Sequence, residues 1–221
     1  MEDMSDADTW DKRYKTADLI WSEGPNQLVA DLVTPLSPGR AVDLGTGEGR
    51  NAIWLASRGW QVTAVDFSAV GIEKARTLAG ARGVEVTWVV ADLTNEHIPR
   101  ERAFDLALIA YLHLPTEQLR HVLTGAAKSL TPGGHLLVIG HDRSNLEKGI
   151  GGPQDPAVLY TTDLIESTLD EVEMDFALDR SEIAERIVQP ASGTSNPRIG
   201  NDVANAEGNV ALDTLVWGRR L

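Results

Sequence analysis

Three glycines recur at every second position in the segment AVDLGTGEGRNA, which covers residues 41–52. The apolar residues before Gly45 are typical of a strand, and the residues after Gly49 are typical of a helix. Glycine permits positive φ angles and leaves room for a ligand close to the backbone. The start of the helix offers unpaired N–H groups as well. The segment therefore predicts a ligand-binding turn, with a purely structural turn as the alternative.

Aspartates stand at or beside the ends of three apolar stretches, as Asp43, Asp66 and Asp92. Because ligands of parallel sheets bind beyond the carboxyl ends of the strands, we expect these carboxylates to share one binding edge. Asp66 follows Gly45 by 21 residues, which suits a carboxylate that accepts hydrogen bonds from both ribose hydroxyls. Asp92 is placed to accept a hydrogen bond from an adenine amino group. The pattern predicts a nucleoside site.

Two charged residues argue against phosphate groups in that ligand. Arg50 stands where a dinucleotide fingerprint has its third glycine, and its bulk obstructs close packing over a pyrophosphate. Asp43 lies just before the turn, where its negative charge favours a cationic or hydroxyl-bearing ligand. The alternative for Asp43 is that it caps the following helix. We expect a phosphate-free, positively charged nucleoside.

Short apolar stretches supply the strands that such a site needs. Several lack the alternation of a half-exposed strand, which is typical of parallel strands covered on both faces. Helical patterns lie between them, one beginning after Ser68 as N-cap and another after Thr116. Strands alternating with helices predict a doubly wound parallel sheet with right-handed crossovers. The strands are expected at 41–44, 62–65, 86–90, 106–110 and 135–140.

The last third of the chain has a different pattern. Two strand-like stretches, 182–189 and 209–221, flank the turn-forming segment 190–209, which we expect to be a long loop. They predict an antiparallel hairpin that completes an α/β, Rossmann-like sheet of seven strands, mostly parallel. Residues 163–185 hold nine acidic residues and one basic residue. We interpret them as the solvated face of a helix, with a rim that attracts cationic ligands as the alternative.

Charge and composition narrow the class of partner. The 221 residues carry a formal net charge of −13 and contain no basic run, so nucleic acid and anionic membrane surfaces are poor partners. The absence of cysteine excludes disulfides and thiolate chemistry and is compatible with the cytoplasm. The acidic start is unlike a signal peptide. No apolar run approaches the ~20 residues of a membrane helix.

Several motifs together resemble those of class I S-adenosylmethionine-dependent methyltransferases, in particular the tellurite-resistance and thiopurine methyltransferase-like branch. The resemblance implies S-adenosyl-L-methionine as cofactor. It does not extend to an Asn-Pro-Pro-Tyr or Asp-Pro-Pro-Tyr motif, which argues against methylation of nucleobase amino groups in DNA. The motifs are WDKRY (10–14), WSEGPN (21–26), VDLGTGEGRNAIWLA (42–56), VTAVDFS (62–68), VVADL (89–93) and FDLALIAYLHLP (104–115).

The resemblance also implies a role for individual residues in binding the cofactor. Gly45 and Gly47 would back its methionine and ribose, Asp66 would hold the ribose hydroxyls, and Asp92 would bind the adenine amino group. Thr46 replaces a cysteine that is frequent in relatives, and its small size suffices. The full set of expected cofactor-binding residues is Arg13, Tyr14, Asp43, Gly45, Thr46, Gly47, Arg50, Asn51, Asp66, Phe67, Ser68, Asp92 and Leu93.

Candidate catalytic residues follow the fourth and fifth predicted strands. Tyr111 and His113 follow the fourth, and His141 follows the fifth. A histidine near its ordinary pKa suits a general base at neutral pH. The alternatives are a packed aromatic for Tyr111 and backbone-bonded loop histidines for the other two. His141 with Asp142 would also fit the start of a metal site, but no further ligand set stands out, so we expect no metal.

The sequence thus predicts a cytoplasmic enzyme that transfers a methyl group to a small molecule by in-line displacement, mainly through positioning. A nicotinamide-dependent oxidoreductase and a non-catalytic cofactor-binding protein are the alternatives. We expect one domain over 1–221, composed of a cofactor-covering segment (1–36), a cofactor-binding core (37–145) and a substrate-side and hairpin region (146–221). Glycines within 149–153 predict a flexible connection that serves as a lid hinge.

Overall fold

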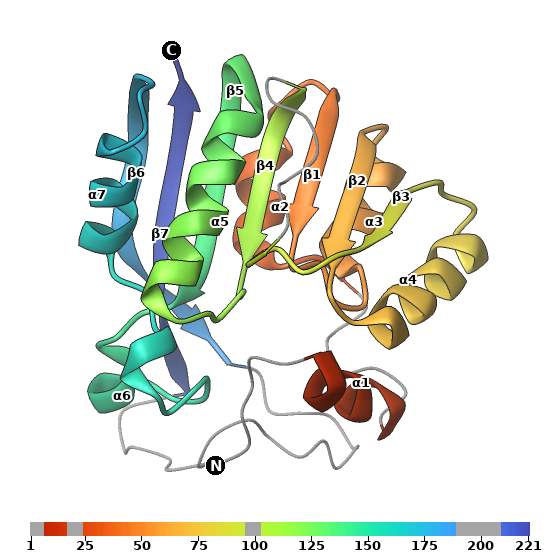
Figure 1. Cartoon of the computed structure of the whole chain (residues 1–221), viewed down its shortest axis with the longest axis horizontal. Helices are drawn as coiled ribbons and strands as arrows, with labels where there is room; N and C mark the ends of the chain where they lie inside the picture. The colour runs from red at the N-terminus through yellow and green to blue at the C-terminus, as the bar shows by residue number, and fades with distance from the viewer. Residues whose placement is uncertain (1–6, 17–23, 96–102, 189–208) are drawn as a thin grey trace.

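The computed structural model describes residues 7–16, 24–95, 103–188 and 209–221. Seven strands form one sheet in the order β3-β2-β1-β4-β5-β7-β6 (Figure 1). Every pairing from β3 to β5 is parallel, whereas β7 is antiparallel to both of its neighbours. The predicted fold class is therefore confirmed. The strands are β1 (Arg40–Leu44), β2 (Gln61–Asp66), β3 (Thr87–Val90), β4 (Phe104–Ala110), β5 (Leu130–His141), β6 (Phe176–Ile187) and β7 (Val210–Arg220).

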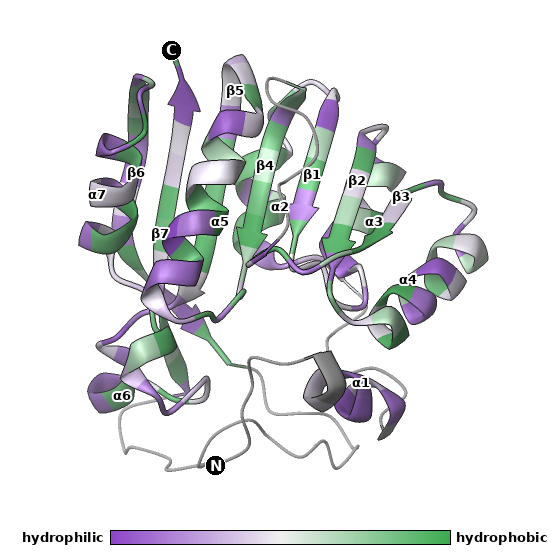
Figure 2. Ribbon diagram, in the orientation of Figure 1, coloured by the Kyte–Doolittle hydropathy of each residue, from purple (hydrophilic) through white to green (hydrophobic). Residues whose placement is uncertain are grey.

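Helices cover both faces of the sheet because the central strands consist mostly of apolar residues, as Figure 2 shows for β4. Helices α2 and α3 pack on one face and α5 and α7 on the other. The predicted N-cap Ser68 accepts a hydrogen bond from Gly71 N at 3.0 Å, and α5 begins at Thr116 as expected. The helices are α1 (Ala7–Thr16), α2 (Gln27–Val33), α3 (Arg50–Ser57), α4 (Ala69–Ala81), α5 (Thr116–Ser129), α6 (Asn145–Lys148) and α7 (Thr162–Asp170), with a 3-10 turn at Pro156–Val158.

The acidic stretch 163–185 is not the face of one helix. Helix α7 ends at Asp170, and strand β6 begins at Phe176, six residues earlier than the sequence pattern indicates. The early part of β6 was missed because its residues are only half-buried at the edge of the sheet. The predicted hairpin of β6 and β7 is confirmed. The predicted loop 190–209 lies outside the described residues, except for Asn209.

The carboxyl ends of β1 to β4 meet at one edge of the sheet, beyond which α1 and α6 lie (Figure 1). This is the edge at which parallel α/β sheets bind ligands. Within the part of the chain that the structure describes, none of the helices has the length and hydropathy of a membrane span.

Candidate functional site

The glycine turn between β1 and α3 has the conformation that its sequence requires. Gly45, Gly47 and Gly49 all have positive φ, at 76°, 56° and 78°. The N–H groups of Gly45 and Thr46 donate to Val65 O of β2, at 2.9 and 3.1 Å. These two hydrogen bonds fix the turn against the neighbouring strand. The turn therefore presents backbone rather than side chains at the carboxyl edge of the sheet.

Asp66 at the end of β2 joins the turn to the start of α4. Its buried carboxylate accepts from Gly47 N at 2.8 Å and from Ser68 N at 2.9 Å. Burial raises the pKa of Asp66 to about 6, although these backbone hydrogen bonds oppose the rise. Each carboxylate oxygen has two lone pairs, so both keep capacity for a further donor such as a ribose hydroxyl.

Asp43 in β1 is buried directly behind the turn. Its Oδ2 accepts a hydrogen bond from Thr46 Oγ1 at 2.7 Å. Burial raises its pKa to about 6; the hydrogen bond from Thr46 opposes this, and the nearby charge of Asp66 adds to it. Two buried carboxylates in each other's field make the turn favourable for a cationic ligand.

Asp92 and Leu93 follow β3 at the same edge. Asp92 accepts hydrogen bonds from Thr94 N and Oγ1, at 2.9 and 2.7 Å, and from Asn95 Nδ2 at 2.7 Å. These bonds lower the pKa of Asp92 against the opposing effect of burial. Leu93 is buried in the main hydrophobic core. The structure thus brings all three predicted aspartates to the edge beside the glycine turn.

Helix α1 docks on the start of α4, next to the turn. Asp11 Oδ1 accepts from Ser68 Oγ at 2.5 Å and from Val70 N at 3.3 Å. Tyr14 is buried, and its ring faces Gly71, where an added Cβ would lie 3.1 Å from the ring and 3.3 Å from Gly47 O. Arg13 stacks over the ring of Trp10, 5.4 Å from its centroid. Arg13 and Tyr14 therefore lie on the element that reaches the glycine turn.

Asn51, by contrast, supports the scaffold. Its Oδ1 accepts from Asn26 N at 2.9 Å, and Asn26 in turn caps α2 through Leu28 N at 2.9 Å. Arg50 beside it is largely buried, and burial lowers its pKa; Tyr111 and Arg186 are among the charged and polar groups near it. Phe67 is half-buried directly after Asp66.

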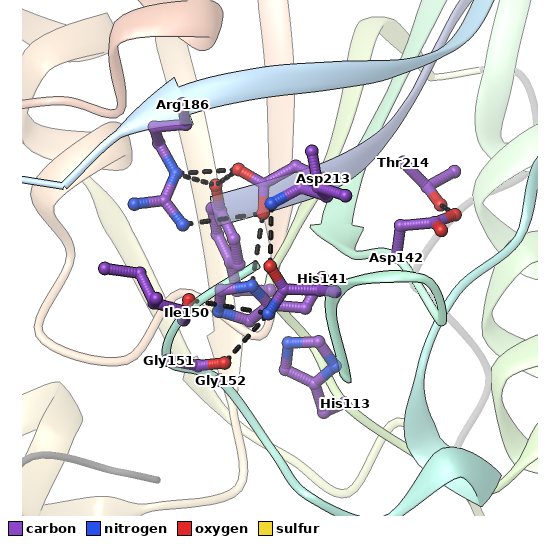
Figure 3. Close-up of polar contacts among 12 residues, drawn as sticks. His113, His141, Asp142, Ile150, Gly151, Gly152, Arg186, Asp213 and Thr214 are labelled. Atoms are coloured by element: carbon purple, nitrogen blue, oxygen red, sulfur yellow. Dashed lines mark hydrogen bonds and ion pairs between the residues drawn. The ribbon is translucent and has the colours of Figure 1, made fainter. Parts of the chain in front are cut away.

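The predicted catalytic residues converge on a carboxylate that the sequence analysis did not single out (Figure 3). Asp213 on β7 is fully buried. Its Oδ2 accepts from Tyr111 Oη at 2.6 Å and from Arg186 Nε at 2.7 Å. His141 Nδ1 lies 3.2 Å from its Oδ1. Burial raises the pKa of Asp213, but the contacts with His141 and Arg186 outweigh it and hold the pKa well below its usual range.

Tyr111 has a φ of 61°, which is rare for a residue with a side chain. Its hydroxyl donates to Asp213 and accepts from Arg186 Nε at 3.1 Å and from Asn26 Nδ2 at 3.3 Å. Burial raises the pKa of Tyr111, and the charge of Asp213 adds to the rise, so the phenol keeps its proton. Backbone strain of this kind clusters at functional sites, which is compatible with a role for Tyr111 in such a site.

His113 stacks on His141, with ring centroids 5.4 Å apart and planes 16° from parallel. Its Nδ1 lies 3.0 Å from Val158 O. Burial lowers the pKa of His113 to about 4, and the neighbouring His141 adds to the effect. His113 is therefore a neutral imidazole at pH 7.

Asp142 has a structural role. Its carboxylate accepts from Thr214 Oγ1 at 2.6 Å and from Ser144 N at 2.8 Å, and so ties β5 to β7 and to the following turn. Among the described residues, no group of three or more histidine, aspartate or glutamate side chains forms a candidate metal site.

Four site residues escaped the sequence analysis: Asp11, Asn26, Arg186 and Asp213. Asp213 carries a usable signal, because it is an acidic residue within the apolar stretch NVALDTLVW. A carboxylate at such a position is buried only if it is paired. Its partners Arg186, His141 and Tyr111 lie 27, 72 and 102 residues away in the chain. The spacing of these residues in the sequence therefore does not identify them as partners.

A family model described as a methyltransferase domain matches residues 41–134. This part of the chain is therefore similar to a methyltransferase domain. The matched residues run from the start of β1 to the middle of β5 and include the glycine turn and the three aspartates of the carboxyl edge.

A curated methyltransferase is similar in sequence to just over half of the chain. Demethylmenaquinone methyltransferase of Thermus thermophilus is 34% identical over 125 residues, which are 56% of this chain and 54% of that protein. The chain thus spans about half the length of the curated relatives it matches.

Two solved structures share the fold of this chain. TehB from Haemophilus influenzae superposes with a TM-score of 0.68 at 16% identity, covering 97% of this chain and 67% of that one. N-methyltransferase NodS from Bradyrhizobium japonicum, solved with S-adenosyl-l-homocysteine, gives 0.67 at 16% identity and covers 99% of both chains. The probable S-adenosyl-L-methionine-dependent methyltransferase TehB of Haemophilus influenzae is also similar in sequence, at 22% identity over 132 residues, which are 60% of this chain and 44% of that protein. Together with the family match, this similarity confirms the predicted resemblance to class I methyltransferases of the TehB-like branch.

Proposed function

We propose that this chain is an S-adenosylmethionine-dependent methyltransferase that acts on a small molecule. The observation that carries the proposal is the glycine turn backed by two buried carboxylates, Asp43 and Asp66, whose pKa values burial raises to about 6. Such a turn favours a cationic nucleoside over a phosphate-bearing one. The methyltransferase family of the domain supports the same cofactor.

We assign the cofactor-binding roles as the family resemblance implies, and the positions described above support them. Gly45 and Gly47 back the methionine and ribose, and Asp66 accepts the ribose hydroxyls. Asp92 accepts from the adenine amino group, while Phe67 and Leu93 contact the ring. Arg13 and Tyr14 close the site from α1, which hydrogen bonds hold at the start of α4.

Methyl transfer from a sulfonium is an in-line displacement. A lone pair of the acceptor attacks the methyl carbon, the C–S bond breaks, and its electron pair stays on sulfur as a thioether. The enzyme contributes most by aligning donor and acceptor in a dry site. We assign the acceptor side to Tyr111, His113 and His141, which adjoin the carboxyl ends of β4 and β5.

The acceptor is proposed to be a small molecule rather than nucleic acid or a membrane surface. The formal net charge of −13 opposes binding to phosphate backbones and to anionic lipid surfaces. We also propose that residues 1–221 act as one domain, because the acceptor-side residues follow β4 and β5 and contact Arg186 of β6 and Asp213 of β7 in the same sheet.

Calorimetry with S-adenosylmethionine and S-adenosylhomocysteine tests the cofactor assignment. We expect both to bind, and we expect Asp66→Ala to abolish binding because the ribose acceptor and the anchor of the turn are lost. Asp105→Asn is the matched control, since Asp105 lies at the amino end of β4, where it accepts from Arg40 N. It should leave the affinity unchanged.

A panel of cofactors separates the alternatives. Stabilisation of the protein by NADH but not by S-adenosylhomocysteine, in a thermal-shift measurement, would replace this proposal with an oxidoreductase. Release of S-adenosylhomocysteine in the presence of a metabolite pool is the result expected of an enzyme. Cofactor binding without any release would make the chain a non-catalytic binding protein.

A further inference from the structure

The carboxylate of Asp213 has no part in the proposed cofactor contacts, yet it is the centre of the acceptor-side network. It is fully buried, and its strand partner across β5 and β7 is His141. Tyr111 Oη and Arg186 Nε donate to one oxygen, and His141 Nδ1 faces the other (Figure 3). A buried charge without such partners would be strongly destabilising. The network thus keeps Asp213 ionised in the interior.

An ionised carboxylate is only an acceptor of hydrogen bonds, so the atom that faces it determines where the imidazole proton lies. His141 Nδ1 is 3.2 Å from Asp213 Oδ1, an ion-pair contact that falls short of an ideally aligned hydrogen bond. Contacts of this kind commonly tighten when substrate binds. The contact with Asp213 therefore favours a proton on Nδ1, which leaves the lone pair on Nε2.

The same reasoning applies to His113. Its Nδ1 faces the carbonyl oxygen of Val158 at 3.0 Å, and a carbonyl also only accepts. Its Nε2 is buried and has no hydrogen-bond partner among the described residues. The two stacked rings thus share one tautomer, and both present a lone pair on Nε2. An unpartnered buried acceptor is costly, so this site favours a ligand that brings a proton donor.

Nearby charges select the kind of donor. Arg186 Nε lies 3.1 Å from Tyr111 Oη, on the acceptor side. Arg50 is largely buried, which lowers its pKa, and the charge of Arg186 lowers that pKa further. A protonated amine would meet this positive field, whereas an oxygen that gains negative charge as it loses its proton is stabilised by it. A hydroxyl group therefore fits the site better than an ammonium group.

We propose that Asp213 is a positioning residue that fixes His141 with its proton on Nδ1, so that Nε2 accepts the proton of a hydroxyl group, and that the acceptor is accordingly methylated on oxygen. This inference rests on the proposed methyltransferase function. Tyr111 and His113 after β4 and Asp213 on β7 face His141, and Gly152 packs against its ring. Arg186 on β6 contacts Asp213 from the other side.

The step balances in atoms and charge. The O–H bond breaks as its proton moves to His141 Nε2, the oxygen lone pair forms the new C–O bond, and the C–S bond breaks with its electron pair left on sulfur. The positive charge passes from the sulfonium to the imidazolium. Asp213, opposite Nδ1, stabilises that imidazolium.

Nitrogen-15 NMR of the histidine side chains, in protein saturated with S-adenosylhomocysteine, tests the positioning role without any turnover. We expect the spectrum of the Nδ1-protonated tautomer for His141, and a shift toward mixed tautomers in Asp213→Asn. Asp142→Asn is the matched control: it alters a buried carboxylate on the adjoining residue that contacts Thr214 and Ser144 instead of the histidine. It should leave the tautomer unchanged. An Nε2-protonated His141 in the unaltered protein overturns the proposal.

Methyl transfer to 2-naphthol and to 2-naphthalenethiol tests the acceptor class, because a thiol is acidic enough to need little base. With His141→Gln we expect kcat on naphthol to fall about 10²-fold or more, the usual contribution of a general base, and kcat on the thiol to change far less. Asp213→Asn should follow the same pattern. Equal losses on both acceptors, or methylation of the thiol alone by the unaltered protein, overturn the assignment to oxygen.

Calorimetry on the same samples keeps the two levels of inference apart. If the unaltered protein does not bind S-adenosylhomocysteine, the proposed function itself is refuted. Normal binding together with the wrong tautomer of His141 would refute only the role of Asp213.

Discussion

Asp43 and Asp66 are carboxylates that the fold buries behind a backbone turn. Their pKa values are raised to about 6, chiefly by burial, so each is largely ionised at pH 7 and largely protonated at pH 5 in the free protein. A cationic ligand stabilises the ionised forms and lowers both pKa values. Cofactor binding is thereby linked to the release of protons.

From this linkage we predict that the affinity for S-adenosylmethionine falls as the pH is lowered from 7 to 5. Below about pH 6 the loss should approach tenfold per pH unit for each carboxylate that must ionise. Calorimetry at several pH values, in buffers of different ionisation enthalpy, measures the affinity and the protons released. Asp43→Asn should make the dependence shallower. An affinity that stays constant over this range would contradict the role given to the two carboxylates.

For individual residues, the sequence was sufficient to predict positions beside the glycine turn but not most of those elsewhere in the site. Asp43, Asp66 and Asp92 were predictable because each stands at or within two residues of the end of a strand, where the topology fixes its position. The role of Asn51 in holding Asn26 was not predictable. The two residues lie 25 positions apart, and the sequence around neither of them indicates the contact. Asp213 was missed because its partners come from three other strands or their ends.

The N-cap residue of helix α3, Gly49, lies where the structure leaves no room for a side chain. Gly49 caps α3 with a φ of 78°, and an added Cβ would lie 2.7 Å from the ring of Trp88 and 2.9 Å from Ala75 Cβ. The turn is thus locked between β3 and α4 as well as by its own conformation. Close packing and backbone conformation both require glycine here.

We expect Gly49→Ala to lower the free energy of unfolding by about 2–4 kcal/mol, which combines the cost of a left-handed residue with that of overpacking. Gly83→Ala is the matched control, since Gly83 also has a positive φ, 64°, but has open space around it. It should lose only about 1–2 kcal/mol. Denaturant unfolding of the two variants measures the difference, and equal losses would show that the contact with Trp88 is readily relieved.

Among the secondary-structure elements, the parallel strands were predictable from the sequence. For the edge strand β6, the sequence predicted the strand but not where it begins. The five apolar stretches correspond to β1 to β5. For the central strands the reason is burial on both faces, which leaves a continuous apolar signature. Strand β3 lies at the edge and is only half-buried or exposed, but its residues, Thr87–Val90, are apolar or β-branched. Strand β6 lies at the edge of the sheet, and its first residues alternate weakly, so the sequence pattern placed its start too late. Helix α1 was expected to cover the cofactor, but its anchor, Asp11, was not anticipated.

Over the whole molecule, two hydrophobic clusters span the sheet from its parallel half to its C-terminal hairpin. One joins Val42 of β1 to Val216 of β7, and the other joins Val29 of α2 to Leu215 of β7. The proposed boundary near residue 145 therefore runs through shared cores instead of separating them.

We accordingly predict that the protein unfolds in one cooperative transition. Calorimetric and van't Hoff enthalpies of thermal unfolding should agree, and saturating S-adenosylhomocysteine should move the single transition to higher temperature because the ligand binds only the folded state. Two resolved transitions, with only one shifted by the ligand, would instead divide the chain into a cofactor-binding part and an independent C-terminal part.

The position of Asp213 has a consequence for how the protein matures during synthesis. The glycine turn and its aspartates all precede residue 93, whereas the carboxylate that orients His141 lies on the last strand, 72 residues after it. While the chain is still emerging from the ribosome, the pocket for the methyl donor is encoded well before the group that would set the proton acceptor. A nascent polypeptide that has formed its first five strands would thus bind the methyl donor before Asp213 can orient His141 for the transfer.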